Sequence, residues 1–195
     1  MKTVGKALAL FLLMVLSPSG HAGQLPDELI KSAVSAVLAS YESGKDKLDT
    51  DPSHLRGIIV EHILPHIDFV LMSKLVLGKH WRKATDTQRG EFIDGFRELL
   101  IRTYTKPLSE YSGQKVNFLP YHEGNKPTLA TVYTEIVPHG GVPIPVSYRL
   151  RFKEQDGWKV FDMSIDNISL VTNYRSTFSG EIARSGLDKL IASLQ

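Results

Sequence analysis

The sequence predicts an α+β fold in which a four-stranded antiparallel sheet packs against several helices. Apolar residues recur with helical spacing from residue 25 to about residue 105, and they alternate with polar residues between about residues 114 and 166. Helical spacing then returns and continues to residue 194. Because the strand-like segments follow one another directly, an antiparallel sheet needs no crossover helix between them.

Three helices are predicted before residue 78. The first covers residues 25–43 and stops at Gly44. The second begins at Ser53, directly after a proline suited to a first helical turn, and Pro65 ends or kinks it. The third covers about residues 65–77 and is apolar on nearly every side.

A longer fourth helix is predicted over about residues 86–105, and it can continue past Pro107. Thr85 and Gln88 have the spacing of a capping box at its start. The apolar face of this helix comprises Phe92, Phe96, Leu99, Leu100 and Tyr104.

Four strands and two further helices complete the predicted fold. In the last strand Phe161, Met163 and Ile165 are expected on one face. The penultimate helix begins at Ile168 and places Leu170, Val171, Tyr174 and Phe178 along one side. The predicted strands are residues 115–124, 127–137, 144–153 and 158–166, and the predicted helices are residues 168–184 and 187–194.

The N-terminal 22 residues have the order of a secretory signal peptide. Lys2 and Lys6 precede a short apolar run that ends at Leu16, and small residues lead up to Ala22. Cleavage after Ala22 leaves residues 23–195 as one exported domain, which we expect in the periplasm. The apolar run is too short to span a bilayer.

The charge and cysteine content exclude several classes of protein. Residues 23–195 carry 21 basic and 21 acidic residues, a balance that does not suit nucleic-acid binding. The chain has no cysteine, so it contains no disulfide bond and offers no attachment point for a lipoprotein anchor. At this length, a hydrophobic core can stabilise the fold without such cross-links.

Sequence motifs give little support to catalysis or metal binding. His62 and His66 are four residues apart beside Glu61, but Pro65 disturbs the helical geometry that would bring both rings onto one ion. Asp162 and Asp166 could form a carboxylate pair for acid–base work, yet a solvated strand end is the more ordinary interpretation. Neither a metal nor a cofactor is expected.

Two long segments resemble the MlaC family, also called toluene-tolerance proteins. Residues 72–104 contain Leu-Gly-x-x-Trp-Arg, then a Thr-x-x-Gln cap and a helix with two phenylalanines. Residues 156–178 resemble the family's Gly-Trp strand followed by Ser-Leu-Val-x-Asn-Tyr-Arg-x-x-Phe. Gly186 to Ile191 matches the family's ending, so the resemblance covers nearly all of residues 27–195.

This resemblance implies both a fold and a function. It implies a sheet-and-helix domain related to NTF2-like and cystatin-like shapes, with lipid acyl chains held between sheet and helices. It also implies a periplasmic carrier of glycerophospholipid, which exchanges lipid between an outer-membrane lipoprotein and porin complex and an inner-membrane ABC transporter to maintain outer-membrane asymmetry.

The resemblance implies that the apolar faces of the helices and strands form a lipid-binding site. Three arginines that border apolar stripes, Arg102, Arg149 and Arg175, are candidates for contacting a phosphate head group. Arg175 is also a candidate for a purely structural contact. The predicted lipid-binding residues are Met72, Leu75, Trp81, Phe92, Phe96, Leu99, Leu100, Tyr104, Val132, Val146, Tyr148, Leu150, Met163, Leu170, Val171, Tyr174 and Phe178.

Two other functions remain open from the residues alone. One is an envelope adaptor protein, in which the same apolar faces form an ordinary packed core. The other is a small enzyme on an NTF2-like scaffold that acts on a hydrophobic substrate with Asp162 or Tyr148 as its acid–base residue. The carrier predicts bound phospholipid, the adaptor predicts none, and the enzyme predicts turnover.

Overall fold

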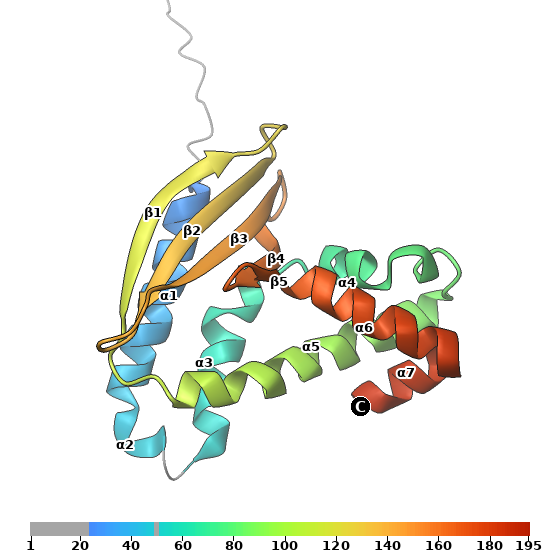
Figure 1. Cartoon of the computed structure of the whole chain (residues 1–195), viewed down its shortest axis with the longest axis horizontal. Helices are drawn as coiled ribbons and strands as arrows, with labels where there is room; N and C mark the ends of the chain where they lie inside the picture. The colour runs from blue at the N-terminus through green and yellow to red at the C-terminus, as the bar shows by residue number, and fades with distance from the viewer. Residues whose placement is uncertain (1–23, 49–50) are drawn as a thin grey trace, which may run out of the picture.

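The computed structural model describes residues 24–48 and 51–195, and the predicted signal peptide lies outside them. A curved sheet with α1 behind it occupies one side of the molecule, and a layer of helices extends from it on the other (Figure 1). The helices are α1 (Pro26–Ser43), α2 (Lys45–Leu48), α3 (Pro52–His62), α4 (Phe69–Leu77), α5 (Asp86–Ser109), α6 (Leu170–Ser185) and α7 (Leu187–Leu194), with 3₁₀ turns η1 (Leu64–His66) and η2 (Gly78–His80).

The sheet has the order β1-β2-β3-β4-β5, and neighbouring strands are antiparallel. The α+β class and the four long strands are therefore confirmed, and the short β5 is an addition to the prediction. The strands are β1 (Lys115–Glu123), β2 (Leu129–Val137), β3 (Ile144–Lys153), β4 (Gly157–Ile165) and β5 (Ile168–Ser169).

The short strand β5 corrects the predicted start of the penultimate helix. Asp166 and Asn167 have φ angles of 49° and 64°, a left-handed conformation that reverses the chain. Ile168 therefore pairs with Ile165 at the edge of the sheet instead of starting a helix. Helix α6 begins two residues later, with the Ser169 side chain accepting a hydrogen bond from the Thr172 N–H.

An irregularity in β4 changes which side chains share a face. Arg149 pairs with Asp162, whereas the next residue of β3, Leu150, pairs with Val160, so Phe161 is an extra residue in the ladder. The prediction that Phe161 lies on the face of Met163 is wrong, because the Arg149 guanidinium lies 4.8 Å from the centre of the Phe161 ring.

Strand β1 forms one edge of the sheet and is also irregular. Its register with β2 shifts between Leu119 and His122, around Pro120, which has no N–H to donate to a ladder. Phe118 and Leu119 are each 39% exposed. This edge therefore combines exposed apolar side chains with an interrupted line of backbone donors.

Helix α1 covers one face of the sheet and also contacts α3. Near its start, Leu29 and Ile30 pack with the buried strand residues Val132, Leu150 and Val160. Its second half forms a separate cluster with α3, which includes Val37, Tyr41, Leu55 and Ile58. The Tyr41 hydroxyl donates to the backbone oxygen of Tyr111 at 2.6 Å, so this cluster also positions the chain between α5 and β1.

A second core joins α4, α5, α6 and α7. Phe92 and Phe96 are fully buried on α5, and the ring of Phe178 from α6 meets both edge-on at 5.9 and 6.0 Å. The predicted capping box forms at the start of α5, where Thr85 and Gln88 exchange hydrogen bonds of 2.9 and 3.2 Å. Helix α5 continues past residue 107 to Ser109, as the sequence allowed.

The predicted third helix is split by an extended residue. Pro65 lies in η1, and Ile67 then adopts an extended conformation and forms a parallel bridge with Val160 on the outer edge of β4. The Asp68 N–H donates to the Val160 backbone oxygen at 2.8 Å. The Asp68 side chain caps α4 by accepting from the Leu71 N–H at 3.0 Å, so this helix starts at residue 69.

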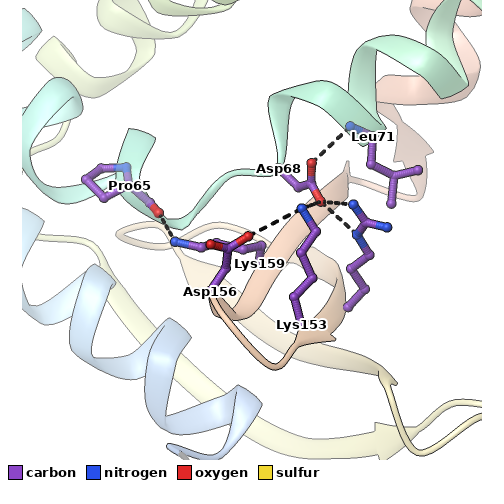
Figure 2. Close-up of polar contacts among 7 residues, drawn as sticks. Pro65, Asp68, Leu71, Lys153, Asp156 and Lys159 are labelled. Atoms are coloured by element: carbon purple, nitrogen blue, oxygen red, sulfur yellow. Dashed lines mark hydrogen bonds and ion pairs between the residues drawn. The ribbon is translucent and has the colours of Figure 1, made fainter.

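Asp68 is also the acceptor of an ion-pair cluster between α4 and the sheet (Figure 2). Its Oδ2 atom lies 2.7 Å from Arg151 Nε and 3.1 Å from Lys153 Nζ. Burial alone would raise the pKa of Asp68, but the Leu71 N–H and the two cations hold this pKa below its ordinary value. The ionised carboxylate therefore stabilises the contact between the two layers.

We expect Asp68→Asn to be about 2–3 kcal/mol less stable than the wild type at pH 7, because two cations lose their buried partner. The folded pKa of Asp68 is lowered, so its stabilisation is present above the unfolded pKa of about 3.9 and is lost as the pH falls through the folded value. Urea unfolding followed by circular dichroism should show the two proteins converging below about pH 4. Asp156→Asn, which removes an exposed partner of Lys153, should change stability by about 0.5 kcal/mol or less.

Two glycines of α5 form a matched pair for testing the position of α7. A Cβ atom at Gly95 would lie 2.8 Å from Leu194 Cβ, whereas a Cβ atom at Gly90 would have no neighbour within 4 Å. Gly90→Ala should therefore stabilise the protein by about 0.5–1 kcal/mol through helix propensity. Gly95→Ala should destabilise it, because α7 must shift. Equal thermal shifts for both variants would contradict this packing.

Candidate functional site

The seventeen predicted lipid-binding residues do not form one facing set of helix and strand side chains. The predicted strand residues Val132 and Leu150 pack on Leu29 and Ile30 of α1, and Tyr148 lies against the same cluster. Val146 and Leu170 are buried elsewhere, and Tyr104 and Met163 are half-buried. The remaining ten belong to the helical core: Met72, Leu75, Trp81, Phe92, Phe96, Leu99, Leu100, Val171, Tyr174 and Phe178.

A row of aliphatic side chains crosses the α1-facing side of the sheet at the end where β2 finishes and β3 begins. Ile136 pairs with Ile144, and Val146 pairs with Ile165. Ile165 in turn pairs with Ile168 of β5. Because directly paired residues point to the same face, this aliphatic row is continuous with the face that carries Val132 and Leu150; its members are Ile136, Ile144, Val146, Ile165 and Ile168.

Helix α1 leaves part of this aliphatic row uncovered. Ile144 is 37% exposed and Ile168 is 61% exposed, and the side chains of Ile136 and Ile165 are only half-buried. Helix α5 packs mainly on α3, α4 and α7. In Figure 1, α5 passes below this end of the sheet, and β5 leads directly into α6.

Half-buried side chains are also found on α5 and α6. Leu99, Leu100 and Tyr174 lie at the border of the helical core. Burial and the neighbouring Tyr174 raise the pKa of Tyr104 to about 12. Tyr104 and Tyr174 therefore lie near each other, and each presents an apolar ring and a polar tip.

Tyr148 lies closer to the sheet core. Its hydroxyl is 3.3 Å from Thr134 Oγ1, and Thr134 is itself buried. Burial raises the pKa of Tyr148, and the contact with Thr134 partly opposes the rise. The neutral hydroxyl is thus satisfied inside the fold, while the ring packs beside α1.

The three candidate head-group arginines each have a partner within the protein. Arg102 Nη2 donates to the Leu194 backbone oxygen at 3.1 Å, and Arg175 Nε donates to the Leu75 backbone oxygen at 2.6 Å. Arg149 lies 3.5 Å from Asp162 Oδ2, with its side chain 55% exposed. Arg175, also a candidate for a purely structural contact, thus forms a hydrogen bond that joins α6 to α4.

The groups singled out for chemistry are engaged in structural contacts. Asp162 is 2% exposed, so its interpretation as a solvated strand end is wrong. Its carboxylate accepts from the Ser169 hydroxyl at 2.8 Å and from the Val171 N–H at 3.1 Å, which fixes the start of α6. His62 Nε2 lies 2.7 Å from the Ser40 hydroxyl. Within residues 24–48 and 51–195, no group of His, Asp and Glu side chains is arranged to hold a metal ion.

A separate groove of about 550 Å³ lies between α3, the start of α4, α5 and the β3–β4 hairpin. Sequence reasoning missed it, since none of the predicted site residues lines it. Val60 and Val70, which are 44% and 55% exposed, lie in its wall. Charged groups border it, among them Arg97, Lys153 and Lys159 with Asp156.

An uncovered aliphatic row on the sheet, together with half-buried aromatic side chains on α5 and α6, is typical of proteins that bind an apolar or amphiphilic ligand. In the part of the chain that the structure describes, no helix combines the length and apolarity needed to cross a bilayer. The sequence matches the MlaC protein family over residues 31–195. The chain belongs to this family.

Individual relatives agree with this assignment. The intermembrane phospholipid transport system binding protein MlaC of Haemophilus influenzae is 27% identical over 172 residues, covering 87% of this chain and 80% of the relative. Toluene tolerance protein ttg2D of Pseudomonas putida is 26% identical over 175 residues, with the same coverage.

A solved structure extends the similarity to three dimensions. The phospholipid-binding protein of Ralstonia solanacearum, solved in complex with a phospholipid, superposes with a TM-score of 0.78 at 29% identity. The match covers 86% of this chain and 93% of that protein. The architecture described above is thus shared with a protein whose structure contains a phospholipid.

The surroundings of Tyr104 can be tested by absorbance. A titration at 295 nm should show one tyrosine with an apparent pKa of about 12 that is missing in Tyr104→Phe. The folded pKa is raised, so the contribution to stability is complete below the unfolded pKa of about 10 and is lost as the pH rises further. If the wild-type and Tyr104→Phe curves instead separate already near pH 10, Tyr104 is solvated.

Proposed function

We propose that this protein is a periplasmic, non-enzymatic carrier of glycerophospholipid. The acyl chains of the bound phospholipid would lie between the aliphatic row on the sheet and the half-buried side chains of α5 and α6. The observation that carries the proposal is this uncovered row in a fold shared with a phospholipid-bound relative. The carrier has no cofactor, and the phospholipid is its cargo.

Physical chemistry sets a demanding condition for such a carrier. Each exposed methylene costs about 0.8 kcal/mol, so two acyl chains of roughly 30 methylenes would cost on the order of 24 kcal/mol in water. The protein must therefore cover almost the whole tail. Aliphatic side chains together with Met163, which adapts to variable shapes, suit this requirement.

The tyrosines suit the boundary between tail and head group. The raised pKa of Tyr104 keeps its hydroxyl neutral at physiological pH, so it carries no charge that an acyl chain would have to desolvate. The side chain of Arg149 is 55% exposed, but it pairs with Asp162 and alternates with Tyr148 and Leu150, so it lies on the face of the sheet opposite the aliphatic row and is not placed to meet a phosphate there. Arg102 and Arg175 would first have to give up backbone contacts.

Cargo exchange then depends on partner proteins. Acyl chains gain similar burial in the carrier and in a bilayer, so the carrier alone does not set the direction of transport. We propose the two partner complexes that the MlaC family implies, one with an outer-membrane lipoprotein and porin and one with an inner-membrane ABC transporter. The name of the Haemophilus influenzae relative, which specifies an intermembrane phospholipid transport system, supports this proposal.

Native mass spectrometry of the mature protein, purified from periplasm without detergent, tests the proposal directly. We expect a discrete mass increment that denaturing extraction identifies as glycerophospholipid. A single apo mass that stays unchanged after incubation with phospholipid vesicles would instead support the adaptor with a packed core.

A matched pair of variants places the cargo. Ile144→Glu puts a charge on the aliphatic row and should lower bound phospholipid at least tenfold, because a carboxylate beside an acyl chain loses its hydration. Leu119→Glu makes the same kind of change at a residue of similar exposure on the opposite face and should leave lipid binding intact. Equal lipid loss in both variants would contradict the placement.

A further inference from the structure

The loop between α4 and α5, residues 78–84, carries an unusual concentration of positive charge. Residues 74 to 89 contain five basic side chains and one acidic one, whereas residues 23–195 as a whole carry equal numbers of basic and acidic residues. Lys79, Arg82 and Lys83 are all exposed. Within the described residues none of the three makes an ion pair or a side-chain hydrogen bond. We call residues 78–84 the basic loop.

The basic loop has a defined shape. Gly78 has a φ of +53°, which a residue with a Cβ atom rarely adopts, and it turns the chain sharply at the end of α4. The N–H groups of Lys83 and Ala84 both donate to the His80 oxygen, at 3.1 and 3.0 Å. Burial lowers the pKa of His80, and the nearby charges of Lys79 and Lys83 lower it further.

Trp81 holds the basic loop to the helical layer. Its ring packs at the border of the helical core, and the Arg89 guanidinium lies 5.3 Å from the ring centre. Arg89 Nε also donates to the Trp81 oxygen at 3.1 Å, and its Nη1 pairs with Asp86 at 2.8 Å. The single aromatic ring of the loop is thus used internally, while the three free cations point away from the packed layer.

The three exposed cations and the lack of an exposed aromatic anchor favour a partner that is recognised by its negative charge and not by a complementary shape. A specific protein interface is centred on buried aromatic or apolar anchors, and the basic loop offers none, since Trp81 is already packed. Lysine and arginine side chains near an anionic leaflet gain binding energy simply from charge density. The acidic neighbours Asp86 and Asp188 are engaged with Arg89 and Gln88.

We propose that the basic loop docks this protein onto the surface of an anionic phospholipid bilayer. The loop lies at the end of the helical layer distant from the sheet (Figure 1), so this contact is separate from the aliphatic row. Docking is electrostatic and reversible, and it concentrates the protein at the membrane without insertion. This role goes beyond lipid carriage and does not require bound cargo.

Vesicle flotation tests the docking with a charge-matched control. The loop variant combines Lys79→Gln, Arg82→Gln and Lys83→Gln. The control variant combines Lys31→Gln, Lys115→Gln and Lys126→Gln, which removes the same charge from exposed lysines of α1, β1 and the β1–β2 turn. Wild-type protein should float with phosphatidylethanolamine vesicles containing about 30% phosphatidylglycerol and not with pure phosphatidylcholine. Its binding should weaken between about 50 and 300 mM salt.

The loop variant should bind these anionic vesicles about a hundredfold more weakly than the wild type, at about fivefold per basic residue. The control variant should remain within about threefold of the wild type. Equal losses of vesicle binding in both variants would overturn the proposal. Absence of flotation of the wild-type protein at low salt would also overturn it, and would assign the basic loop to an acidic protein surface instead.

Lipid content measured on the same samples separates the two proposals. The loop variant should retain the wild-type amount of bound phospholipid, since its substitutions lie outside the aliphatic row. Wild-type protein that floats with the vesicles but carries no bound phospholipid would contradict the proposed lipid carriage and leave the proposed docking unaffected.

Discussion

The connection between Ile67, Asp68 and the outer edge of β4 determines how the two halves of this protein fit together. One extended residue adds to the sheet through Val160, and the next starts α4 while its carboxylate reaches back to Arg151 and Lys153. Ile67 contributes to both the sheet core and the helical core. The position of the helical layer relative to the sheet therefore depends on a two-residue segment held by backbone and ionic contacts together.

The long elements were predictable because each has a continuous apolar face, and the capping box of α5 has a strong local signal. The errors concern residues whose conformation depends on pairing with a distant strand. Ile67 and Ile168 were both placed in helices, yet each is extended and pairs with β4. The extra residue Phe161 also follows from that ladder and leaves no mark in the alternation of the sequence. Local periodicity cannot detect a register set by residues far apart in the chain.

The same limit applies to the candidate site. Periodicity correctly placed Phe92, Phe96 and Phe178 on inward faces, but it could not say which element covers which face. Val132 and Leu150 meet α1 because that helix crosses the sheet, whereas the aliphatic row from Ile136 to Ile168 emerges only when four strands are aligned. One sequence signal did point to the aliphatic row: Ile144 continues the apolar alternation of β3 beyond the part of the sheet that α1 covers.

The irregular edge strand β1 has a consequence for the protein's behaviour when crowded. A regular, apolar sheet edge is a template on which another chain can add a strand, and this is a common start of aggregation. The exposed side chains of Phe118 and Leu119 would favour such strand addition. Pro120, however, lacks a backbone N–H donor, and the ladder with β2 shifts register there. The interruption at Pro120 thus makes this edge a poor template for strand addition by a second chain, even though the edge carries exposed apolar side chains.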